Sequence, residues 1–329
     1  MNRFNAICVT LLAAVTATGA EREVRVHNGD VVLAGTLALP DNVAPTAVVV
    51  LATGSGAQDR DESLAGHAPF RILSDSLAAA GFAVLRMDDR GTASSTGDYA
   101  SARLSDFDSD IEAGLAFVDS CLHGVKKGVI GHSQGGQTAI KLAARGKCDF
   151  IVTLAVPAWR GDSIIMSQSR AMATAITGRW DAEPLQRRLM DIAGSNQPDY
   201  MAHTMIYMAL AESVGEMSRM PAVRERLEAS TNALLSPAYR DMLRYDPADN
   251  IKAVDVPWLA LNGDKDTQVL PQNLLTIKQL NPSAETVVLP GHNHLFQICT
   301  TGLVTEYESL AQSPSSETLT TIISWLGKL

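Results

Sequence analysis

The sequence predicts an α/β fold in which a mostly parallel central sheet carries helices on both faces and bears an inserted helical cap. Two observations predict this class. Short, continuous apolar runs alternate with stretches of helical periodicity, which is the pattern of strand–helix–strand crossovers. Residues 158–246 interrupt this alternation with helical periodicity and no strand pattern. We therefore expect a core made of residues 21–157 and 247–329, with residues 158–246 as the cap.

The first expected elements are strands. Residues 21–40 alternate apolar and polar side chains around Asn28-Gly29, a pair that favours a tight hairpin turn. The next run, AVVVLA at residues 47–52, is apolar throughout and rich in β-branched residues, as expected for a strand buried on both faces.

The rest of the core follows in alternation. Apolar runs predict further strands at residues 82–86, 128–130, 150–156, 258–261 and 285–289. Helical spacing of apolar residues predicts helices at residues 69–80, 106–122, 134–145, 271–280 and 316–326.

Composition and charge exclude several classes of protein. Hydrophobic residues make up 46% of the 329 residues and charged residues 19%, which is typical of a packed domain and not of a disordered chain. The net charge of −9 is opposite in sign to a general nucleic-acid-binding surface, so no nucleic-acid partner is expected. After the N-terminus, no apolar run approaches the roughly 20 residues of a membrane span. The sequence does not indicate an oligomeric state.

Residues 1–20 have the pattern of a cleaved signal peptide. Arg3 supplies a positive start, residues 6–17 are apolar but too short to span a bilayer, and Thr18 and Ala20 are small residues at the expected cleavage positions. We therefore expect a secreted or periplasmic protein that begins at Glu21.

The strongest motif is Gly131-His132-Ser133-Gln134-Gly135, which has the form G-x-S-x-G between a predicted strand and a predicted helix. Glycines in this position allow a sharp turn that presents the serine as a nucleophile. The helix that follows brings its partly positive N-terminus close to Ser133, which suits a negative charge forming on a substrate oxygen.

A nucleophilic serine needs a base and an acid, and both follow in the expected chain order. Asp264 and Asp266 come after the strand at residues 258–261, and we favour Asp266 because it leaves room for a turn. His292 and His294 come after the last strand, and we favour His294 because the apolar pair that follows it could anchor its loop.

The glycine-rich loop after residues 47–52 is the candidate second half of an oxyanion hole. We assign the donors to the backbone N–H groups of Ser55 and Gln134, with Gly56 as the alternative to Ser55. A phosphate loop is disfavoured because the Gly-Lys-Ser/Thr ending is missing. We expect His132 to be a packing residue, and the ion pairs of residues 88–91 to brace this loop.

With these motifs placed, the sequence resembles the α/β-hydrolase superfamily, and within it bacterial secreted carboxylesterases related to serine aminopeptidase-like hydrolases. The resemblance rests on five segments in the expected order: GSGAQDRDE (54–62), RMDDRGTASSTGD (86–98), GHSQGG (131–136), GDKDTQV (263–269) and GHNHLFQ (291–297). It implies Asp266 as the acid and His294 as the base. Ala57 departs from the proline that relatives often have.

The expected function is therefore a serine carboxylesterase that hydrolyses small to medium esters through an acyl-enzyme. No metal or organic cofactor is expected, because no His/Cys cluster has zinc spacing. The alternatives are a peptidase or amidase with the same triad, for which Glu183 or Glu212 would recognise an amine, and a non-catalytic binding protein on the same scaffold.

Three cysteines follow the expected cleavage site: Cys121, Cys148 and Cys299. Cys121 and Cys148 end the helices on either side of Ser133 in the sequence, next to strands expected to be neighbours. Since an oxidising compartment permits such a bond, we expect a disulfide between them, with Cys299 unpaired.

Overall fold

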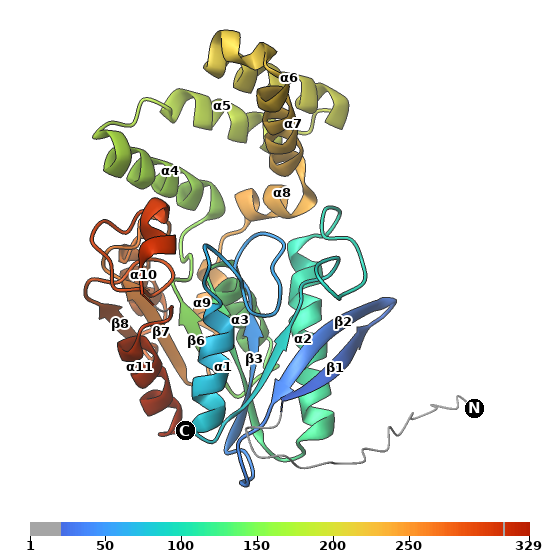
Figure 1. The fold of residues 1–329 in the computed structure, drawn as a ribbon, viewed down its shortest axis with the longest axis vertical. Helices are drawn as coiled ribbons and strands as arrows, with labels where there is room; N and C mark the ends of the chain where they lie inside the picture. Colours follow the sequence, from blue (N-terminus) through green and yellow to red (C-terminus); the bar gives the residue numbers. More distant parts are fainter. Residues whose placement is uncertain (1–20, 312) are drawn as a thin grey trace.

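The computed structural model describes residues 21–311 and 313–329, so the interpretation of residues 1–20 as a signal peptide lies outside the described residues. One eight-stranded sheet has the order β1-β2-β4-β3-β5-β6-β7-β8 (Figure 1). β1 pairs antiparallel with β2, as does β2 with β4, and all other neighbours are parallel. The strands are β1 (Glu21–Asn28), β2 (Val31–Ala38), β3 (Ala47–Ala52), β4 (Ala83–Met87), β5 (Lys126–His132), β6 (Phe150–Leu154), β7 (Trp258–Gly263) and β8 (Glu285–Leu289).

The strand predictions hold in the structure. β1 and β2 form the hairpin, with Asn28 opposite Val31 and Gly29 at a φ of 59°, in the left-handed region that favours glycine. All six residues of β3 are buried, because β3 lies inside the sheet with helices on both sides. The predicted α/β class, with a mostly parallel sheet, is confirmed.

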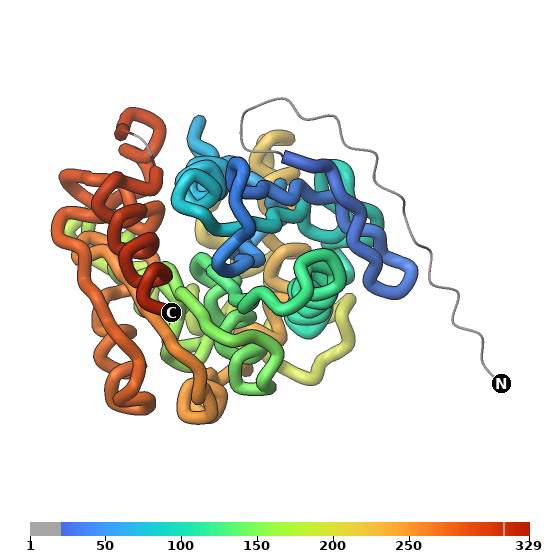
Figure 2. Tube along the Cα trace, turned by 90° about the horizontal axis from the view of Figure 1, so that it is seen from below, coloured from blue at the N-terminus to red at the C-terminus, as the bar shows by residue number. Residues whose placement is uncertain are grey.

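Helices cover both faces of the sheet (Figure 2). A separate apolar core forms on each face. On one face, Leu73 and Ile322 are fully buried against the sheet, from α1 and α11. On the other face, Val118, Ile140 and Ile277 are fully buried, from α2, α3 and α10. The helices of the core are α1 (Pro69–Ala79), α2 (Leu104–Cys121), α3 (Gln134–Ala144), α9 (Ala248–Ala253), α10 (Gln272–Leu280) and α11 (Ser316–Leu326), with the short 3₁₀ helix η2 (Val304–Ser309).

Residues between β6 and α9 form the cap, which lies over the carboxyl edge of the parallel strands (Figure 1). It has its own apolar cluster, which includes Leu189, Ile206 and Leu243. Its two ends meet, because the N–H of Gly161 donates to the carbonyl of Tyr245 at 2.9 Å. The elements are α4 (Gly161–Thr177), α5 (Glu183–Gly194), α6 (Asp199–Val214), η1 (Gly215–Arg219), α7 (Pro221–Leu235) and α8 (Pro237–Arg244).

The predicted disulfide between Cys121 and Cys148 is wrong in this structure, whereas Cys299 is unpaired as expected. Cys121, Cys148 and Cys299 are all free thiols. The physical reason is that Cys121 is exposed at the end of α2, whereas Cys148 is buried in the core on the α3 face of the sheet. Burial raises the pKa of the Cys148 thiol to about 12, so it stays protonated and unreactive.

Within residues 21–311 and 313–329, no helix combines the length and the apolar character that a membrane crossing needs.

Candidate active site

Ser133 lies on a strained turn between β5 and α3. Its backbone has φ 50° and ψ −118°, a conformation that side-chain-bearing residues seldom adopt. Two backbone hydrogen bonds hold the turn: Ser133 N donates to Leu154 O at 2.8 Å, and Gly136 N donates to Ser133 O at 3.0 Å. The turn therefore lifts the serine off the end of β5 and places it at the first turn of α3.

Two glycines of the motif are required by close backbone contact. A Cβ on Gly131 would collide with the carbonyl of Gly135, and a Cβ on Gly135 would collide with the carbonyl of Ala52. Glycine at these positions therefore lets α3 begin directly against the ends of β3 and β5, which is the packing that the sharp turn at Ser133 needs.

Asp266 and His294 lie on the loops after β7 and β8 and are joined by a hydrogen bond. His294 Nδ1 is 2.7 Å from Asp266 Oδ2, and both side chains are buried. The other carboxylate oxygen, Oδ1, accepts the backbone N–H groups of Gln268 (2.8 Å) and Val269 (2.9 Å). Because a carboxylate only accepts, the Nδ1 of His294 carries its proton and Nε2 is left as the free base.

The two alternative residues lie elsewhere. Asp264 is exposed and accepts the N–H of Gly291 at 2.6 Å, so it fixes the turn after β8. His292 is fully buried, and its two ring nitrogens bond to Pro290 O (2.8 Å) and Ser315 Oγ (2.7 Å). Neither side chain lines the pocket that contains Ser133.

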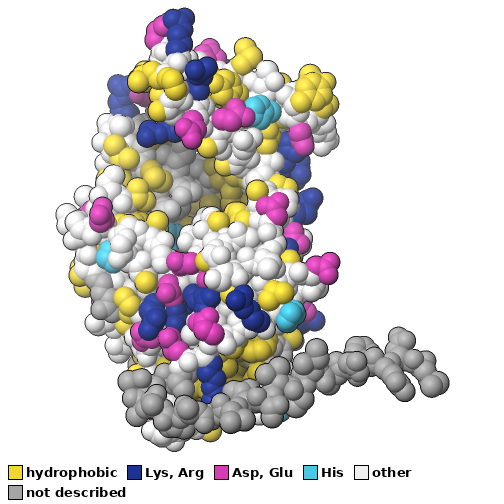
Figure 3. All heavy atoms as spheres, turned by 45° about the vertical axis from the view of Figure 1, so that its right-hand side comes forward, with side chains coloured by type: hydrophobic (Ala, Val, Ile, Leu, Met, Phe, Trp, Pro, Cys, Tyr) yellow, Lys and Arg dark blue, Asp and Glu magenta, His cyan; other side chains and the backbone are white. Residues whose placement is uncertain are grey.

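Ser133 and His294 line one pocket, which lies beneath the cap. Ser133 Oγ forms no hydrogen bond with His294 in the described residues; such bonds often tighten only when substrate binds. Ser55 and Gln134, the proposed oxyanion donors, line the same pocket. Figure 3 shows a hollow between cap and core with hydrophobic side chains around it.

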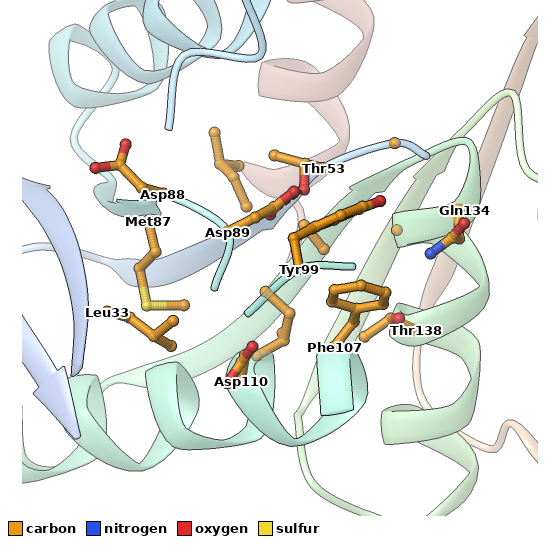
Figure 4. A pocket seen from close by; sticks show the side chains of 15 residues that line it. Leu33, Thr53, Met87, Asp88, Asp89, Tyr99, Phe107, Asp110, Gln134 and Thr138 are labelled. Carbon is orange, nitrogen blue, oxygen red and sulfur yellow. Dashed lines mark hydrogen bonds between the residues drawn. The ribbon is translucent and has the colours of Figure 1, made fainter. Parts of the chain in front are cut away.

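The loop after β3 is held in place from the end of β4. Asp89 accepts hydrogen bonds from Thr53 Oγ1 (2.7 Å) and from the backbone N–H of Gln58 (2.9 Å), and Figure 4 shows Thr53 and Asp89 side by side. Asp88 forms an ion pair with Arg60 at 2.9 Å. Burial raises the pKa of Asp89 to about 7, although these hydrogen bonds act in the opposite direction.

The cap supplies pocket residues that the sequence did not reveal. Ile164 and Gln168 of α4 and Met242 of α8 line the pocket, and Gln168 Nε2 lies 3.4 Å from Gln268 Oε1 of the core. No motif marks Gln168. Gln268 could have been noticed, because it is two residues after Asp266 and within the same segment.

The sequence of this chain is similar to those of known hydrolases. A model of the alpha/beta hydrolase family matches residues 49–304. Esterase EstD of Thermotoga maritima is 23% identical over 268 residues, which cover 80% of this chain and 58% of the relative. The chain thus spans less than two thirds of the length of that relative.

Three solved structures share the fold at low identity. An esterase from Pyrococcus furiosus has a TM-score of 0.58 at 17% identity, covering 94% of this chain and 91% of its own. Proline iminopeptidase from Mycobacterium smegmatis has a TM-score of 0.57 at 18% identity, covering 93% and 98%. Est1E from Butyrivibrio proteoclasticus, solved with ferulic acid bound, has a TM-score of 0.55 at 15% identity, covering 93% and 96%.

Proposed function

The chain belongs to the alpha/beta hydrolase family, and on this premise we propose that it is a serine carboxylesterase with Ser133 as nucleophile, His294 as base and Asp266 as acid. One observation carries the proposal: the 2.7 Å bond between His294 and Asp266 leaves a free Nε2 in the pocket where Ser133 stands on its strained turn. Esterases among the relatives support the same class.

The proposed reaction has two stages. In the first, Ser133 Oγ attacks the ester carbonyl while His294 Nε2 takes the hydroxyl proton, and the same proton then goes to the departing alcohol. In the second, His294 takes a proton from water as the water attacks the acyl-enzyme, and it returns that proton to Ser133 Oγ when the bond from Oγ to the acyl carbon breaks and the acid leaves. Asp266 holds the His294 ring and stabilises the imidazolium that forms in each stage.

The negative charge on the tetrahedral oxygen needs donors that are already in place. We propose the backbone N–H groups of Ser55 and Gln134. Gln134 is the first residue of α3, where the free N–H groups and the helix dipole favour an anion. The hydrogen bonds of Asp89 to Thr53 and Gln58 limit the movement of the loop that carries Ser55.

The pocket lining supports small to medium neutral esters. Pro157, Ile164, Met242 and Val269 give it an apolar part, and uncharged polar side chains, such as that of Gln137, line the rest. Within the described part of the chain, no Asp, Glu, Lys or Arg is among the lining residues, so neither half of the substrate meets a charge there. The flexible methionine side chain adapts to apolar groups of irregular shape, which suits a pocket that accepts different acyl chains.

A peptidase or amidase would use the same triad but would need to recognise an amine. Glu183 and Glu212, the acidic candidates, are instead paired with Arg187 (2.7 Å) and Arg188 (3.1 Å) on the cap, and neither lines the pocket. This favours esters over amine-bearing peptides or amides as the substrate class.

A matched panel of p-nitrophenyl esters and p-nitroanilides, run with wild type and Ser133→Ala, tests the proposal. We expect ester turnover by wild type, little anilide turnover, and neither by Ser133→Ala. A fluorophosphonate should label wild type at Ser133 only. Preferred anilide turnover would indicate a peptidase, and no turnover or labelling would indicate a binding protein.

We also propose that the protein is exported after cleavage between Ala20 and Glu21. N-terminal sequencing of protein recovered outside the cytoplasm should begin at Glu21. Recovery of the full-length chain in the cytoplasm alone would contradict this.

A further inference from the structure

A buried chain of hydrogen bonds joins Glu62 to the loop of the proposed base. Glu62 Oε1 accepts the N–H of Gly54 at 2.6 Å and lies 2.8 Å from His132 Nδ1. The other ring nitrogen of His132, Nε2, lies 3.0 Å from the carbonyl oxygen of His294. Only 3% of the surface of Glu62 and 6% of that of His132 are exposed.

The partners of His132 favour a ring that is protonated at both nitrogens. Its Nε2 faces a carbonyl oxygen, which can only accept, so Nε2 carries a proton. Its Nδ1 faces a carboxylate oxygen that already accepts from Gly54, so Nδ1 donates as well. A neutral imidazole has one N–H, and two are needed here. With Glu62 ionised, these contacts fit an imidazolium.

We propose that Glu62 and His132 form a buried ion pair at neutral pH that positions the three loops of the active site relative to one another. Through Gly54, Glu62 holds the loop that carries Ser55, one of the two proposed oxyanion donors. His132 directly precedes Ser133, and its Nε2–H holds the carbonyl of His294. His132 is thus a positioning residue, and the catalytic part of the inference rests on the proposed function.

The surroundings of His132 are consistent with a retained charge. Burial lowers the pKa of His132, but the charge and hydrogen bond of Glu62 raise it, and the His294 carbonyl and the charge of Asp266 add to this, so the pKa ends above its ordinary value. The His294 ring is also packed against it, with centroids 4.7 Å apart. These groups come from the loops after β3, β7 and β8.

The backbone conformation of Glu62 also indicates that its position is held by specific contacts. Its φ is 54°, in the left-handed region that a non-glycine residue adopts at a cost. The bonds to Gly54 and His132 hold it there. When pH rises through the pKa of His132, the ring loses one N–H, and either the Glu62 bond or the His294 bond is lost. Activity should then fall on the alkaline side.

Glu62→Gln separates charge from shape. Glutamine keeps an oxygen for Gly54 but removes the charge that raises the pKa of His132, so burial dominates and the ring becomes neutral. In ¹H–¹⁵N spectra of wild type at pH 7, both ring nitrogens of His132 should carry protons, and in Glu62→Gln only one. This readout needs no substrate, so it remains decisive even if the wild type hydrolyses no ester.

The kinetic readout then tests positioning. We expect Glu62→Gln to lower kcat about 10- to 100-fold with KM within about twofold, because the reacting groups are misplaced while the pocket is intact. The alkaline limb of its kcat/KM profile should move to lower pH. Glu228→Gln, which removes the charge of the exposed His203–Glu228 pair (2.7 Å) on the cap, is the matched control. It should change neither kcat nor the pH profile of kcat/KM.

If Glu62→Gln folds poorly, the Tm of further variants tests the ion pair. His132→Gln leaves Glu62 charged and unpaired, so its Tm should fall, and the double variant Glu62→Gln/His132→Gln should recover part of the loss. A singly protonated His132 in wild type at pH 7, or a pH profile that Glu62→Gln leaves unchanged, would overturn the proposal.

Discussion

Replacing Asp266 by asparagine tests the reasoning about the proposed base. In the protein, Asp266 Oδ1 accepts two backbone N–H groups at 2.8 and 2.9 Å, and Oδ2 faces His294 Nδ1 at 2.7 Å. In Asp266→Asn, the backbone donors will hold the amide oxygen at the first position, so the amide NH₂ group will face Nδ1. His294 must then accept at Nδ1 and carry its proton at Nε2, where it can no longer take the proton of Ser133.

The expected loss follows from this change of tautomer. We expect kcat to fall about 10,000-fold, the size of effect typical for loss of the orienting carboxylate, which corresponds to about 5.5 kcal/mol of activation free energy. KM should change little, since Asp266 does not line the pocket. Because both backbone N–H groups keep their acceptor, Tm should fall by no more than about 5 °C.

The assay is hydrolysis of p-nitrophenyl butyrate, with thermal unfolding measured on the same samples. Asp264→Asn is the matched control, since this exposed carboxylate is two residues away and bonds only the backbone of the next loop. It should keep activity within about twofold of wild type. An Asp266→Asn variant within tenfold of wild type, or an inactive Asp264→Asn, would refute the reasoning.

Four further outcomes are expected. His294→Ala should lose nearly all esterase activity, whereas His292→Ala should mainly lower Tm; the reverse pattern in kinetics would move the base to His292. In a series of p-nitrophenyl esters, short and medium acyl chains should be preferred, and activity that rises sharply on triglyceride emulsions would contradict this. Folded Asp89, with its pKa raised to about 7 by burial, binds its proton more tightly than unfolded Asp89 does. Its stabilising contribution is complete below about pH 4 and is lost as pH rises through 7. The Tm difference between wild type and Asp89→Asn should therefore fall over that range, and a constant difference would argue against burial as the cause. Alkylation of the native protein should modify exposed Cys121 and spare Cys148 until unfolding, whereas a disulfide-linked peptide in a non-reduced digest would restore the original expectation.

Sequence reasoning succeeded where the determinants are local. The apolar run of β3 and the glycines around Ser133 each reflect contacts within one element or between adjacent ones, so their patterns are visible in the chain. The choice of Asp266 and His294 also came from local spacing. The geometry is compatible with it, and the assignment stays a prediction until the variants are measured.

The sequence did not predict contacts between residues that lie far apart in the chain. His132 was expected only to pack, yet it bonds to Glu62, 70 residues away, and to His294, 162 residues away. The disulfide failed because neighbouring helix ends do not fix which way a side chain points, and Cys121 faces solvent while Cys148 faces the core. The contribution of Gln168 to the pocket depends on how the cap lies on the core, which no local pattern encodes.

The meeting of the two ends of the cap has an evolutionary and engineering consequence. Because the backbones of Gly161 and Tyr245 are hydrogen-bonded to each other, everything between them leaves and rejoins the core at one place. The segment also carries its own apolar cluster. We therefore expect the cap to tolerate exchange: insertions, deletions or replacement by a foreign helical segment should change the pocket wall that Ile164, Gln168 and Met242 supply, while the sheet keeps its register. For the proposed esterase, selectivity and chemistry can then diverge at different rates, and a library within residues 162–244 that keeps the Arg103–Asp241 ion pair to the core should change the first more than the second.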